Sequence, residues 1–487
     1  MSHDHHDLFI DGRLTPAHSK AMLTTINPAT EEPVGSAPDA GADDIEAAVQ
    51  AARAAFRESG WPQLTPKERA RYLWALADEF EKRNGELGAL VTMENGMALS
   101  VCGAFNGIGS ATRYRYYAGL AESWDPEEVR DYPEASSGPA KITTIVRRQP
   151  AGVAGIIVPW NVPQGNVAVK LGAALAAGCT AVIKPSPETP LDSYFLAQAV
   201  TDVGIPPGVV NIVTGGDATG AALVAHPGID MVAFTGSSAV GRKIAAACGA
   251  SLKRVTLELG GKSAGIVLED ADLDLFAATL GSCSVPYSGQ SCRASTRILA
   301  PAARYDEVVD TVAGALAAMP VGDPLDPSTV IGPLVSAAQR DRVEGYIELG
   351  KSEGAKLALG GGRPKGIDRG YYVEPTVFSG VRNDMRVADA GEIFGPVLVV
   401  IRYDNEEEAI AIANDSEYGL GGTVFTRDVE HGLDIARRVE TGSIGVNFAG
   451  MAPNAPFGGV KSSGIGRESG PEGFEEYMTT KSIARQA

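Results

Sequence analysis

The sequence predicts an α/β fold built around a parallel sheet. Four short runs that are almost entirely apolar recur between residues 151 and 235, and segments of helical character separate them. Strands of this kind are buried on both faces, as in a parallel sheet, and their alternation with helices gives βαβ units. A polar or glycine-rich turn follows each run. Because ligands of such sheets bind beyond the carboxyl ends of the strands, these turns mark the expected site.

The N-terminal part is expected to hold short strands followed by helices. Proline and asparagine turns break residues 8–40 into short segments. Apolar residues then recur at helical spacing from Ile45 to Phe56, which predicts a helix. Asp43 and Glu46 resemble the capping box of that helix.

A second helix is predicted to begin at Thr65-Pro66-Lys67-Glu68. Thr65 is the expected cap, Pro66 suits the first turn and Glu68 closes the capping box. The helix should end near Asn84-Gly85, and more helix should follow to about Ala121.

Residues 125–150 differ from the sequence around them. Val129–Tyr132 and Ile142–Arg148 are predicted to form two strands around the turn Ser136-Ser137-Gly138-Pro139. A hairpin at this place has no obvious core to join. We therefore expect it to reach another subunit.

The alternating region gives specific boundaries. Strands are predicted at 153–158, 180–184, 209–213 and 230–234, and helices near 163–177, 190–203, 217–225 and from about 238. The turns after the strands are Pro159-Trp160-Asn161, Lys184-Pro185-Ser186, Gly215-Gly216-Asp217 and the stretch from Thr235 to Gly241. None carries a Gly-x-Gly-x-x-Gly fingerprint. Gly236 and Gly241 still begin a helix whose N-terminus can hold a phosphate.

Composition excludes several classes of function. The 487 residues carry a formal net charge of -18, which argues against nucleic acid or an anionic membrane as the main partner. No run of about eighteen apolar residues predicts a membrane helix. The polar N-terminus lacks the apolar core of a signal peptide, so we expect a cytoplasmic protein. The five scattered cysteines form no Cys-x-x-Cys pair, which predicts neither a disulfide framework nor a metal site.

Two residues are candidates for catalysis. Cys292 follows a glycine turn among small and polar residues, so its thiol should be reachable. A free thiol has a pKa of roughly 8.5 and needs a base or a positive field to react; the alternative is a packed small hydrophobe. Glu258 lies between two leucines, where its pKa should rise toward about 6–7 and suit a general base. The alternative for Glu258 is a salt-bridged glutamate at a strand end.

The combination of motifs resembles the aldehyde dehydrogenase superfamily. Glu258-Leu259-Gly260-Gly261-Lys262 precedes Gly289-Gln290-Ser291-Cys292 by about thirty residues. The remaining motifs occur in the order of that family: Pro159-Trp160-Asn161, Lys184-Pro185-Ser186, Phe234-Thr235-Gly236-Ser237, Glu392-Ile393-Phe394-Gly395-Pro396 and Pro456-Phe457-Gly458-Gly459.

The resemblance implies oxidation of an aldehyde to the acid through a cysteine thiohemiacetal and a thioester. Cys292 would be the nucleophile, and the Asn161 amide with the Cys292 N–H would hold the oxyanion. Glu258 would activate the hydrolytic water. This scheme needs no histidine; beyond residue 18, His226 and His431 alone are available.

The resemblance also implies a nicotinamide dinucleotide crevice. The residues that match its contacts are Ile157, Pro159, Trp160, Lys184, Ser186, Gly216, Gly236, Ser237, Val240, Leu259, Gly260, Glu392 and Phe394. Many NAD-preferring members carry glutamate three residues after the lysine, where this chain has Pro187 followed by Glu188. NADP therefore stays an alternative. NAD is favoured because no arginine or further lysine stands in 185–190 to receive a 2′-phosphate.

Small residues on the expected substrate wall favour a bulky or medium-chain apolar aldehyde, aliphatic, aromatic or terpenoid. No arginine stands in these wall segments to bind an acidic semialdehyde. Candidate linings are Val162, Asn166, Val169, Tyr287, Ser291, Phe448, Met451 and Phe457.

The resemblance implies a Rossmann-type cofactor domain, an α/β catalytic domain and a β-arm for oligomerisation. We assign residues 1–125 and 150–260 to the NAD(P)-binding domain, 261–455 to the catalytic domain, and 126–149 with 470–487 to the arm. Tyr477–Lys481 is the expected last strand of the arm. A homodimer or homotetramer follows by resemblance.

Three rival functions use parts of the same machinery. A cysteine esterase or thioesterase would share Cys292, Asn161 and Glu258 but would not need Lys184 or Glu392. A CoA-acylating dehydrogenase would pass the thioester to a thiol, and some such relatives lack the glutamate base. A non-catalytic protein on this fold would be expected to lose the nucleophile.

Overall fold

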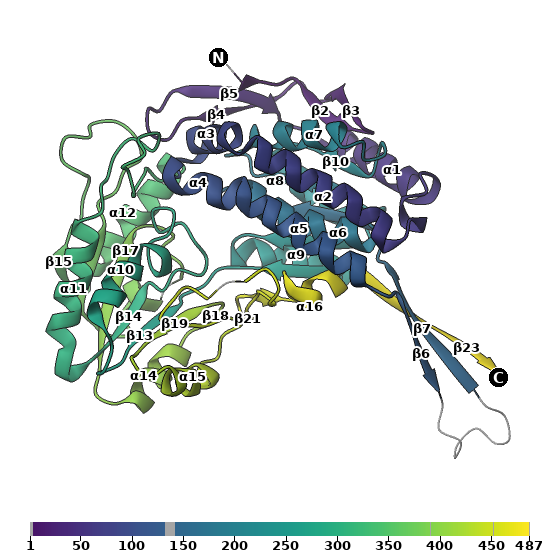
Figure 1. Cartoon of the computed structure of the whole chain (residues 1–487). Coiled ribbons are helices and arrows are strands. Elements are labelled where there is room, and N and C mark those ends of the chain that lie inside the picture. The colour runs from purple at the N-terminus through teal and green to yellow at the C-terminus, as the bar shows by residue number, and fades with distance from the viewer. Residues whose placement is uncertain (1–2, 132–141, 390, 451, 487) are drawn as a thin grey trace.

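The computed structural model describes residues 3–131, 142–389, 391–450 and 452–486 (Figure 1). The chain forms two lobes and a projecting arm, and each lobe is organised around one large sheet. The fold class is therefore α/β, as predicted.

The first lobe contains an eight-stranded sheet. In spatial order its strands are β22 (Gly464–Ile465), β12 (Arg254–Glu258), β11 (Met231–Thr235), β8 (Val153–Ile157), β9 (Thr180–Lys184), β10 (Val210–Ile212), β2 (Asp7–Ile10) and β3 (Arg13–Pro16). The four predicted strands, β8 to β11, are parallel, and β12, which was not predicted as part of the sheet, extends the parallel set to five strands. The flanking β22 and β2 are antiparallel to them.

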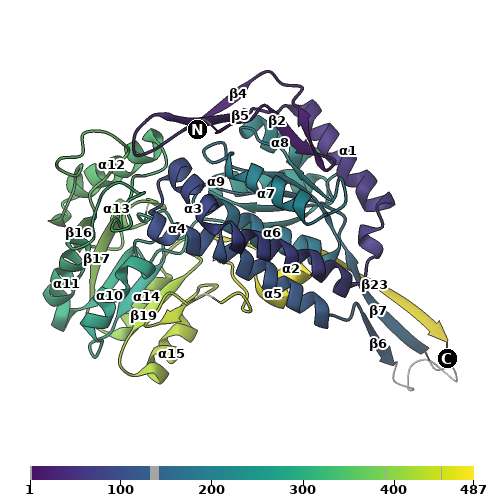
Figure 2. The ribbon, with the colours of Figure 1, turned by 45° about the horizontal axis from the view of Figure 1, so that its top comes forward.

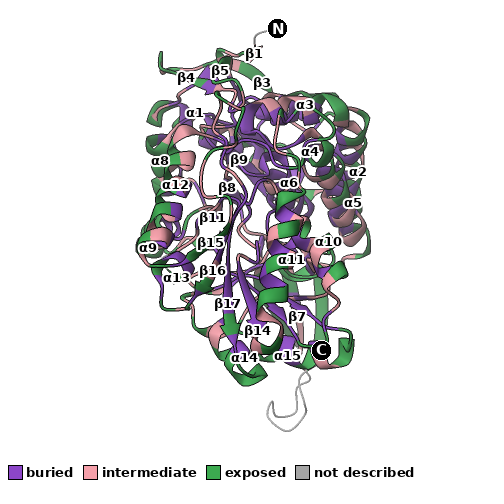
Figure 3. Ribbon diagram, turned by 90° about the vertical axis from the view of Figure 1, so that its left-hand side faces the viewer, coloured by how far each residue is buried: buried purple, intermediate pink, exposed green. Residues whose placement is uncertain are grey.

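Helices cover both faces of this sheet, because its strands are apolar on both sides. Ala154 and Ile156 of β8 join one core, while Val153 and Ile157 join the other. The central strands β8, β9 and β11 are coloured as buried in Figure 3. The first core includes α2 (Pro66–Lys82), α3 (Asn84–Asn95), α4 (Leu99–Asn106), α5 (Ile108–Ser123), α6 (Pro163–Ala177) and α7 (Asp192–Asp202); the second includes α1 (Ala42–Glu58), α8 (Asp217–Ala225) and α9 (Ser238–Ala250).

The predicted start of α2 is confirmed, but the predicted cap of α1 is wrong. Thr65 Oγ1 accepts from the Glu68 N–H at 3.2 Å, and Glu68 Oε2 accepts from the Thr65 N–H at 2.7 Å. In α1 the acid is Asp44, not Glu46, and Asp44 Oδ2 accepts from the Gly41 N–H at 2.9 Å.

The second lobe contains a seven-stranded sheet. Its strands are β15 (Lys356–Leu359), β16 (Thr376–Val381), β17 (Val397–Tyr403), β14 (Arg297–Pro301), β13 (Ala264–Val267), β19 (Gly422–Phe425) and β20 (Gly445–Val446). Its helices are α10 (Leu273–Cys283), α11 (Tyr305–Ala317), α12 (Ala337–Ser352), α13 (Arg386–Asp389), α14 (Glu406–Asn414) and α15 (Val429–Arg438). Two short sheets complete the lobes: β1 (His3–Asp4), β5 (Pro33–Pro38) and β4 (Met22–Ile26); and β18 (Tyr418–Gly419) with β21 (Val460–Lys461).

The arm projects away from both lobes (Figure 2). It consists of β6 (Glu127–Asp131), β7 (Ile142–Pro150) and β23 (Met478–Gln486), which follows α16 (Gly470–Glu475). Both pairings are antiparallel. The C-terminal stretch expected to be the last strand of the arm is thus a strand of the arm, and it pairs with β7. Tyr132 and the predicted turn at 136–139 lie outside the described residues.

No single described helix is long and apolar enough to cross a membrane. Asn84–Asn95 and Leu99–Ser123 pass that test only together, as a pair bent by 114°.

Candidate active site

The carboxyl ends of adjacent parallel strands bring the predicted turns to one edge of the eight-stranded sheet. Thr235 of β11 pairs with Glu258 of β12, and Ile157 of β8 pairs with Lys184 of β9. Pro159, Trp160 and Asn161 follow β8 directly. The edge of the sheet predicted to hold the site is therefore assembled as expected.

The loop before Cys292 has an unusual backbone. Tyr287, Ser288 and Gly289 all have left-handed φ angles, of 50°, 59° and 75°. A Cβ at Gly289 would overlap the Gly395 carbonyl group, so only glycine fits there. Ser288 Oγ anchors the loop by donating to Gly332 O at 3.0 Å. Left-handed non-glycine residues cost on the order of 1–3 kcal/mol each and cluster at functional sites.

The loop and the β8 turn meet through Asn161. The Asn161 Nδ2 donates to Gln290 O at 3.0 Å, two residues before Cys292. Its Oδ1 accepts from Asn166 Nδ2 at 3.3 Å. Asn95 holds the same turn from the other side by donating to Trp160 O at 3.1 Å. These contacts place a fixed amide beside the Cys292 loop.

Glu258 is buried without a hydrogen-bond partner for either carboxylate oxygen among the described residues. Burial raises its pKa well above the ordinary range, and the Glu468 carboxylate raises it further. The predicted direction for this pKa is thus confirmed. A Cβ at Gly458 would lie 2.5 Å from Glu258 Oε1, so the carboxylate depends on a glycine in the facing loop.

Cys292 alone among the five cysteines is partly exposed. Burial of the thiol raises its pKa to about 12, with the Glu392 and Glu258 carboxylates acting in the same direction. A Cβ at Gly261 would overlap the Cys292 carbonyl oxygen, so the loop after β12 must be glycine to lie this close. The resting thiol is therefore neutral and adjacent to buried carboxyl groups.

A buried ion pair beside Glu258 was not predicted from the sequence. The Lys170 Nζ contacts both Glu468 Oε1 and Thr235 Oγ1. The Lys170 side chain is 0% exposed and that of Glu468 is 11% exposed. The feature of the sequence that could have indicated this pair is Lys170 itself, a single lysine within the otherwise apolar residues 167–177 of α6.

Lys184 lies buried at the end of β9, where its Nζ donates to Pro185 O at 2.9 Å. Burial lowers its pKa to about 8, while the carboxylates of Glu188, Asp217 and Asp39 oppose the change. Glu188 reaches back to accept a hydrogen bond from Ser186 Oγ. Acidic groups thus surround the ammonium group expected to hold a ribose.

The start of α9 lies at the end of β11. Ser237 Oγ caps the helix by accepting from the Val240 N–H at 3.4 Å, and Val240 is 42% exposed. The Gly236 N–H donates to Glu258 O at 3.0 Å. A Cβ at Gly241 would meet Leu259 Cδ2 at 2.5 Å, so Leu259 packs closely on the helix. This helix N-terminus is suited to phosphate. On α8, the Gly216 N–H instead donates to Asp39 at 2.9 Å.

Glu392 and Phe394 approach the same crevice from the second lobe. Glu392 Oε1 accepts from the Gly261 N–H at 3.4 Å, and a Cβ at Gly260 would lie 2.9 Å from Oε2. Burial raises the pKa of Glu392 to about 7. Phe394 meets Trp160 edge-on, with ring centroids 5.3 Å apart. Ammonium, helix N-terminus and carboxylate together fit a dinucleotide, which needs partners for two riboses and a pyrophosphate.

A cavity of about 570 Å³ lies beside Phe457 and Arg293. Of the predicted substrate residues, Phe457 lines it. Tyr287 lies behind the cavity wall and packs edge-on against the lining residue Phe105, at 4.5 Å between centroids. The other predicted substrate residues do not line it: Val162 and Val169 are in the core, Asn166 contacts Asn161, Ser291 is 6% exposed, Phe448 is 59% exposed at the surface, and Met451 lies outside the described residues.

Two arginines line this cavity, which the predicted wall segments did not include. Arg113 of α5 donates from Nη1 to Gly109 O at 2.8 Å, and Arg293 donates from Nη1 to Ala449 O at 3.1 Å. Neither forms an ion pair among those found in the described part of the chain. Arg293 follows Cys292 in the sequence, which was a signal that it lies near the site. No feature of the sequence predicted that Arg113 would line this cavity.

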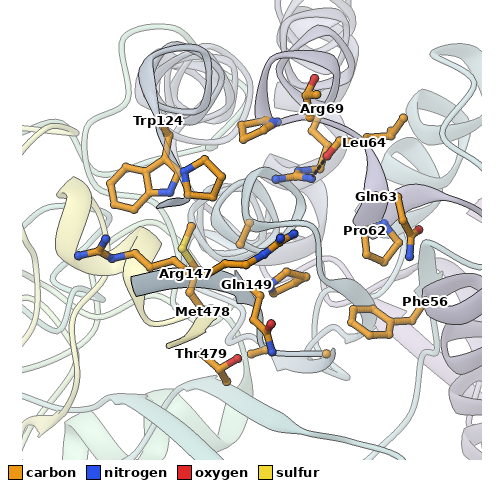
Figure 4. Close-up of a pocket in the computed structure, with 18 of the residues that line it drawn as sticks. Phe56, Pro62, Gln63, Leu64, Arg69, Trp124, Arg147, Gln149, Met478 and Thr479 are labelled. Atoms are coloured by element: carbon orange, nitrogen blue, oxygen red, sulfur yellow. Dashed lines mark hydrogen bonds between the residues drawn. The ribbon is translucent and has the colours of Figure 1, made fainter. Parts of the chain in front are cut away.

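A larger cavity, of about 660 Å³, contains none of the predicted site residues. It lies at the base of the arm, where Arg69, Trp124, Arg147 and Met478 surround it (Figure 4). Size alone therefore does not identify the active site.

The chain is similar to known proteins over nearly its whole length. A sequence profile of the aldehyde dehydrogenase family matches residues 14–483. Geranial dehydrogenase of Castellaniella defragrans is 52% identical over 483 residues, which are 99% of each chain. An aldehyde dehydrogenase of Mycobacterium tuberculosis complexed with NAD+ has a TM-score of 0.95 at 46% identity, covering 99% of this chain and 98% of that one.

A third comparison includes a substrate. Aldehyde dehydrogenase C of Pseudomonas syringae, a cysteine-to-alanine mutant complexed with NAD+ and octanal, has a TM-score of 0.92 at 41% identity. The match covers 98% of this chain and 96% of that one. Since profile, relatives and structures all span nearly the whole sequence, the protein belongs to the aldehyde dehydrogenase family.

Proposed function

We propose that this enzyme oxidises an aldehyde to the carboxylic acid with NAD+ and that Cys292, Asn161 and Glu258 carry out the chemistry. The observation that supports the proposal is the contact of Asn161 with the Cys292 loop at the sheet edge that also carries the buried Glu258. Cys292 supplies a nucleophile, Asn161 a fixed donor, and Glu258 a buried carboxylate with unoccupied oxygens.

The first step is attack of Cys292 Sγ on the carbonyl carbon. Because the thiol has a pKa of about 12, its proton must leave as the bond forms, and Glu258 is the base at hand. The Asn161 amide and the Cys292 N–H donate to the developing oxyanion. Loss of one such donor typically lowers the rate by a factor of about 10²–10³.

When bound, NAD+ accepts the hydride from the substrate carbon, which leaves a thioester on Cys292. Glu258 must first release the thiol proton to solvent, and the ionised carboxylate then takes a proton from a water molecule that attacks this thioester. The raised pKa of Glu258 suits it to this step, because a general base works best with a pKa near the working pH.

Lys184, Ser186 and Glu188 are proposed to hold the adenosine ribose, with the start of α9 and Gly216 beside the pyrophosphate and adenine. Glu392 would hold the nicotinamide ribose, and Ile157, Pro159, Trp160, Leu259, Gly260 and Phe394 would line the crevice. The carboxylates around Lys184 support NAD over NADP, because they repel a 2′-phosphate.

The proposed substrate is an aldehyde with a bulky or medium-length apolar body. Phe105, Ile444 and Phe457 give the cavity its apolar wall. Relatives named for geranial or solved with octanal support the same class. The guanidinium groups of Arg113 and Arg293 add polar surface to this otherwise apolar wall.

We propose the domain division given above and a homodimer or homotetramer formed through the arm. The support is β6, which is exposed along its whole length. Deletion of 130–148 should abolish the oligomer in a sedimentation experiment. The cytoplasmic location stays a prediction.

The deciding experiment follows reduced cofactor with NAD or NADP across short, long, aromatic and carboxylated aldehydes. Cys292→Ala should abolish turnover. Because Glu258→Gln removes the base from both steps, it should give a slower burst of about one reduced cofactor per site and then stall at the thioester, with a steady rate about 10²–10⁴-fold lower. Ester cleavage without cofactor reduction would favour a hydrolase. Product formed only with CoA would favour acylation.

A further inference from the structure

We infer that Asn166 is a positioning residue that fixes which way the Asn161 side-chain amide faces. Resting on the proposed function, this inference assigns Asn166 a role other than lining the substrate wall. The orientation matters because one end of an amide donates and the other accepts. Only the Nδ2 end can stabilise an oxyanion.

The shape of the pocket does not distinguish the two orientations of Asn161, since the NH₂ and oxygen ends of an amide are nearly equal in size. Hydrogen bonding must therefore decide between them. Gln290 O accepts from Asn161 Nδ2 at 3.0 Å, and Asn166 Nδ2 donates to Asn161 Oδ1 at 3.3 Å. One N–H of Nδ2 remains for the oxyanion.

A flip of the Asn161 amide would reverse both contacts. Its oxygen would face the Gln290 carbonyl group, and its N–H groups would face those of Asn166. Asn161 is only 9% exposed, so water would not fully replace the lost bonds. Leaving a buried polar group unsatisfied costs about 1–3 kcal/mol. The Gln290 carbonyl oxygen, which can only accept, supplies one half of this discrimination, and Asn166 supplies the other half while its own amide keeps the Nδ2 end toward Asn161.

The backbone holds Asn166 firmly in this place. Its N–H donates to Val162 O at 2.9 Å in the first turn of α6. Asparagine is a poor residue for a helix interior, and its neighbours Val167 and Ala168 belong to the apolar core. Helix formation and core packing therefore do not account for an amide at this position, whereas its bond to Asn161 does.

The test compares Asn166→Asp with Asn166→Leu, using an aldehyde that the wild type oxidises. Ionised aspartate cannot donate, so it should favour the flipped Asn161 and lower kcat by about 10²–10³, the effect of a lost oxyanion donor. Protonated aspartate can donate, so the kcat of Asn166→Asp relative to the wild type should rise as the pH falls. Asn166→Leu removes the donor without adding a charge and should lower kcat by roughly 10-fold, about 1.4 kcal/mol, at every pH.

Asn405→Asp is the matched control, because it makes the same chemical change at the N-cap of α14 in the second lobe. Aspartate caps a helix as well as asparagine does, so kcat should stay at the wild-type value. Alkylation of Cys292 by iodoacetamide and thermal melting report whether the loop and the fold survive in each variant.

Three results would overturn the inference while leaving the proposed function intact. These are wild-type kcat in both Asn166 variants, an effect on KM alone, or equal losses in Asp and Leu variants that do not change with pH. Failure of the wild type to oxidise any aldehyde would instead refute the proposed function itself.

Discussion

Replacement of Lys170 by methionine is expected to destabilise the fold and to shift the pH dependence of thioester hydrolysis. The Lys170 ammonium group is 0% exposed and contacts Glu468, which is 11% exposed. Removing it leaves the Glu468 carboxylate buried and unpaired. Breaking a buried ion pair in this way costs about 3–5 kcal/mol.

The double variant Lys170→Met/Glu468→Gln separates the loss of the pair from the loss of packing. Both partners are then neutral and nearly isosteric, so most of the lost stability should return. Replacement of both members of a buried pair is often close to neutral. Urea unfolding of wild type, both single variants and the double variant measures the coupling directly.

The pH effect follows from the charges near Glu258. The Lys170 ammonium lowers the pKa of Glu258, and the Glu468 carboxylate raises it. Hydrolysis needs ionised Glu258, so its rate rises with pH through that pKa. Lys170→Met should therefore move the rising part of the pH–rate profile to higher pH, and Glu468→Gln should move it to lower pH. A displacement of one pH unit corresponds to about 1.4 kcal/mol.

Single-turnover hydrolysis of a preformed thioester, measured across pH, isolates this part of the profile from the earlier steps. Shifts of the two single variants in the same direction would refute the electrostatic reasoning. Equal stability of Lys170→Met and the double variant would show that Glu468 is not the group left unpaired.

Three further predictions concern the cofactor end, the core of the first lobe and the substrate cavity. Glu188→Gln should improve the use of NADP relative to NAD on the order of 10-fold, since one carboxylate beside Lys184 is removed; an unchanged ratio of kcat/KM values would contradict this. Burial raises the pKa of Asp192 to about 7, so its ionisation costs stability as pH rises from about 4 to 7; Asp192→Asn should raise the melting temperature at pH 8 and not at pH 4. Arg113→Met should lower KM for octanal and raise it for an aldehyde with a terminal carboxylate, each by roughly 10-fold, about 1.4 kcal/mol; equal shifts would mean that the guanidinium group does not discriminate.

The parallel strands and their turns were predictable because their signals are local. Buried strands such as 153–157 carry no polar side chain, and parallel pairing then brings their carboxyl ends to one edge whatever the remaining fold. Thr65 and Glu68 are likewise close enough in sequence to satisfy each other. The family motifs added the identity of the residues expected at that edge.

The predictions that failed depend on contacts across the chain. Asp44 rather than Glu46 caps α1, and Asp44 Oδ1 also accepts from the His18 N–H at 2.7 Å, a partner 26 residues away. Arg113 joins the cavity because α5 packs beside α6, where a Cβ at Gly165 would lie 3.7 Å from Arg113 Nη1. Helical periodicity does not indicate such a neighbour.

The electrostatics of the site explain why thiol and base must react together. Burial raises the pKa of both Cys292 and Glu258, so the resting thiol stays protonated and the ionised form of Glu258 is a stronger base than an exposed carboxylate. A proton transferred from one to the other creates a thiolate without adding net charge to the site. When the thiolate attacks the aldehyde, the negative charge moves to the carbonyl oxygen. That oxygen faces the Asn161 amide, which is already held in place. The enzyme thus keeps its cysteine protonated until a carbonyl group is present to receive the charge, and Asn161 provides the donor that makes this transfer favourable.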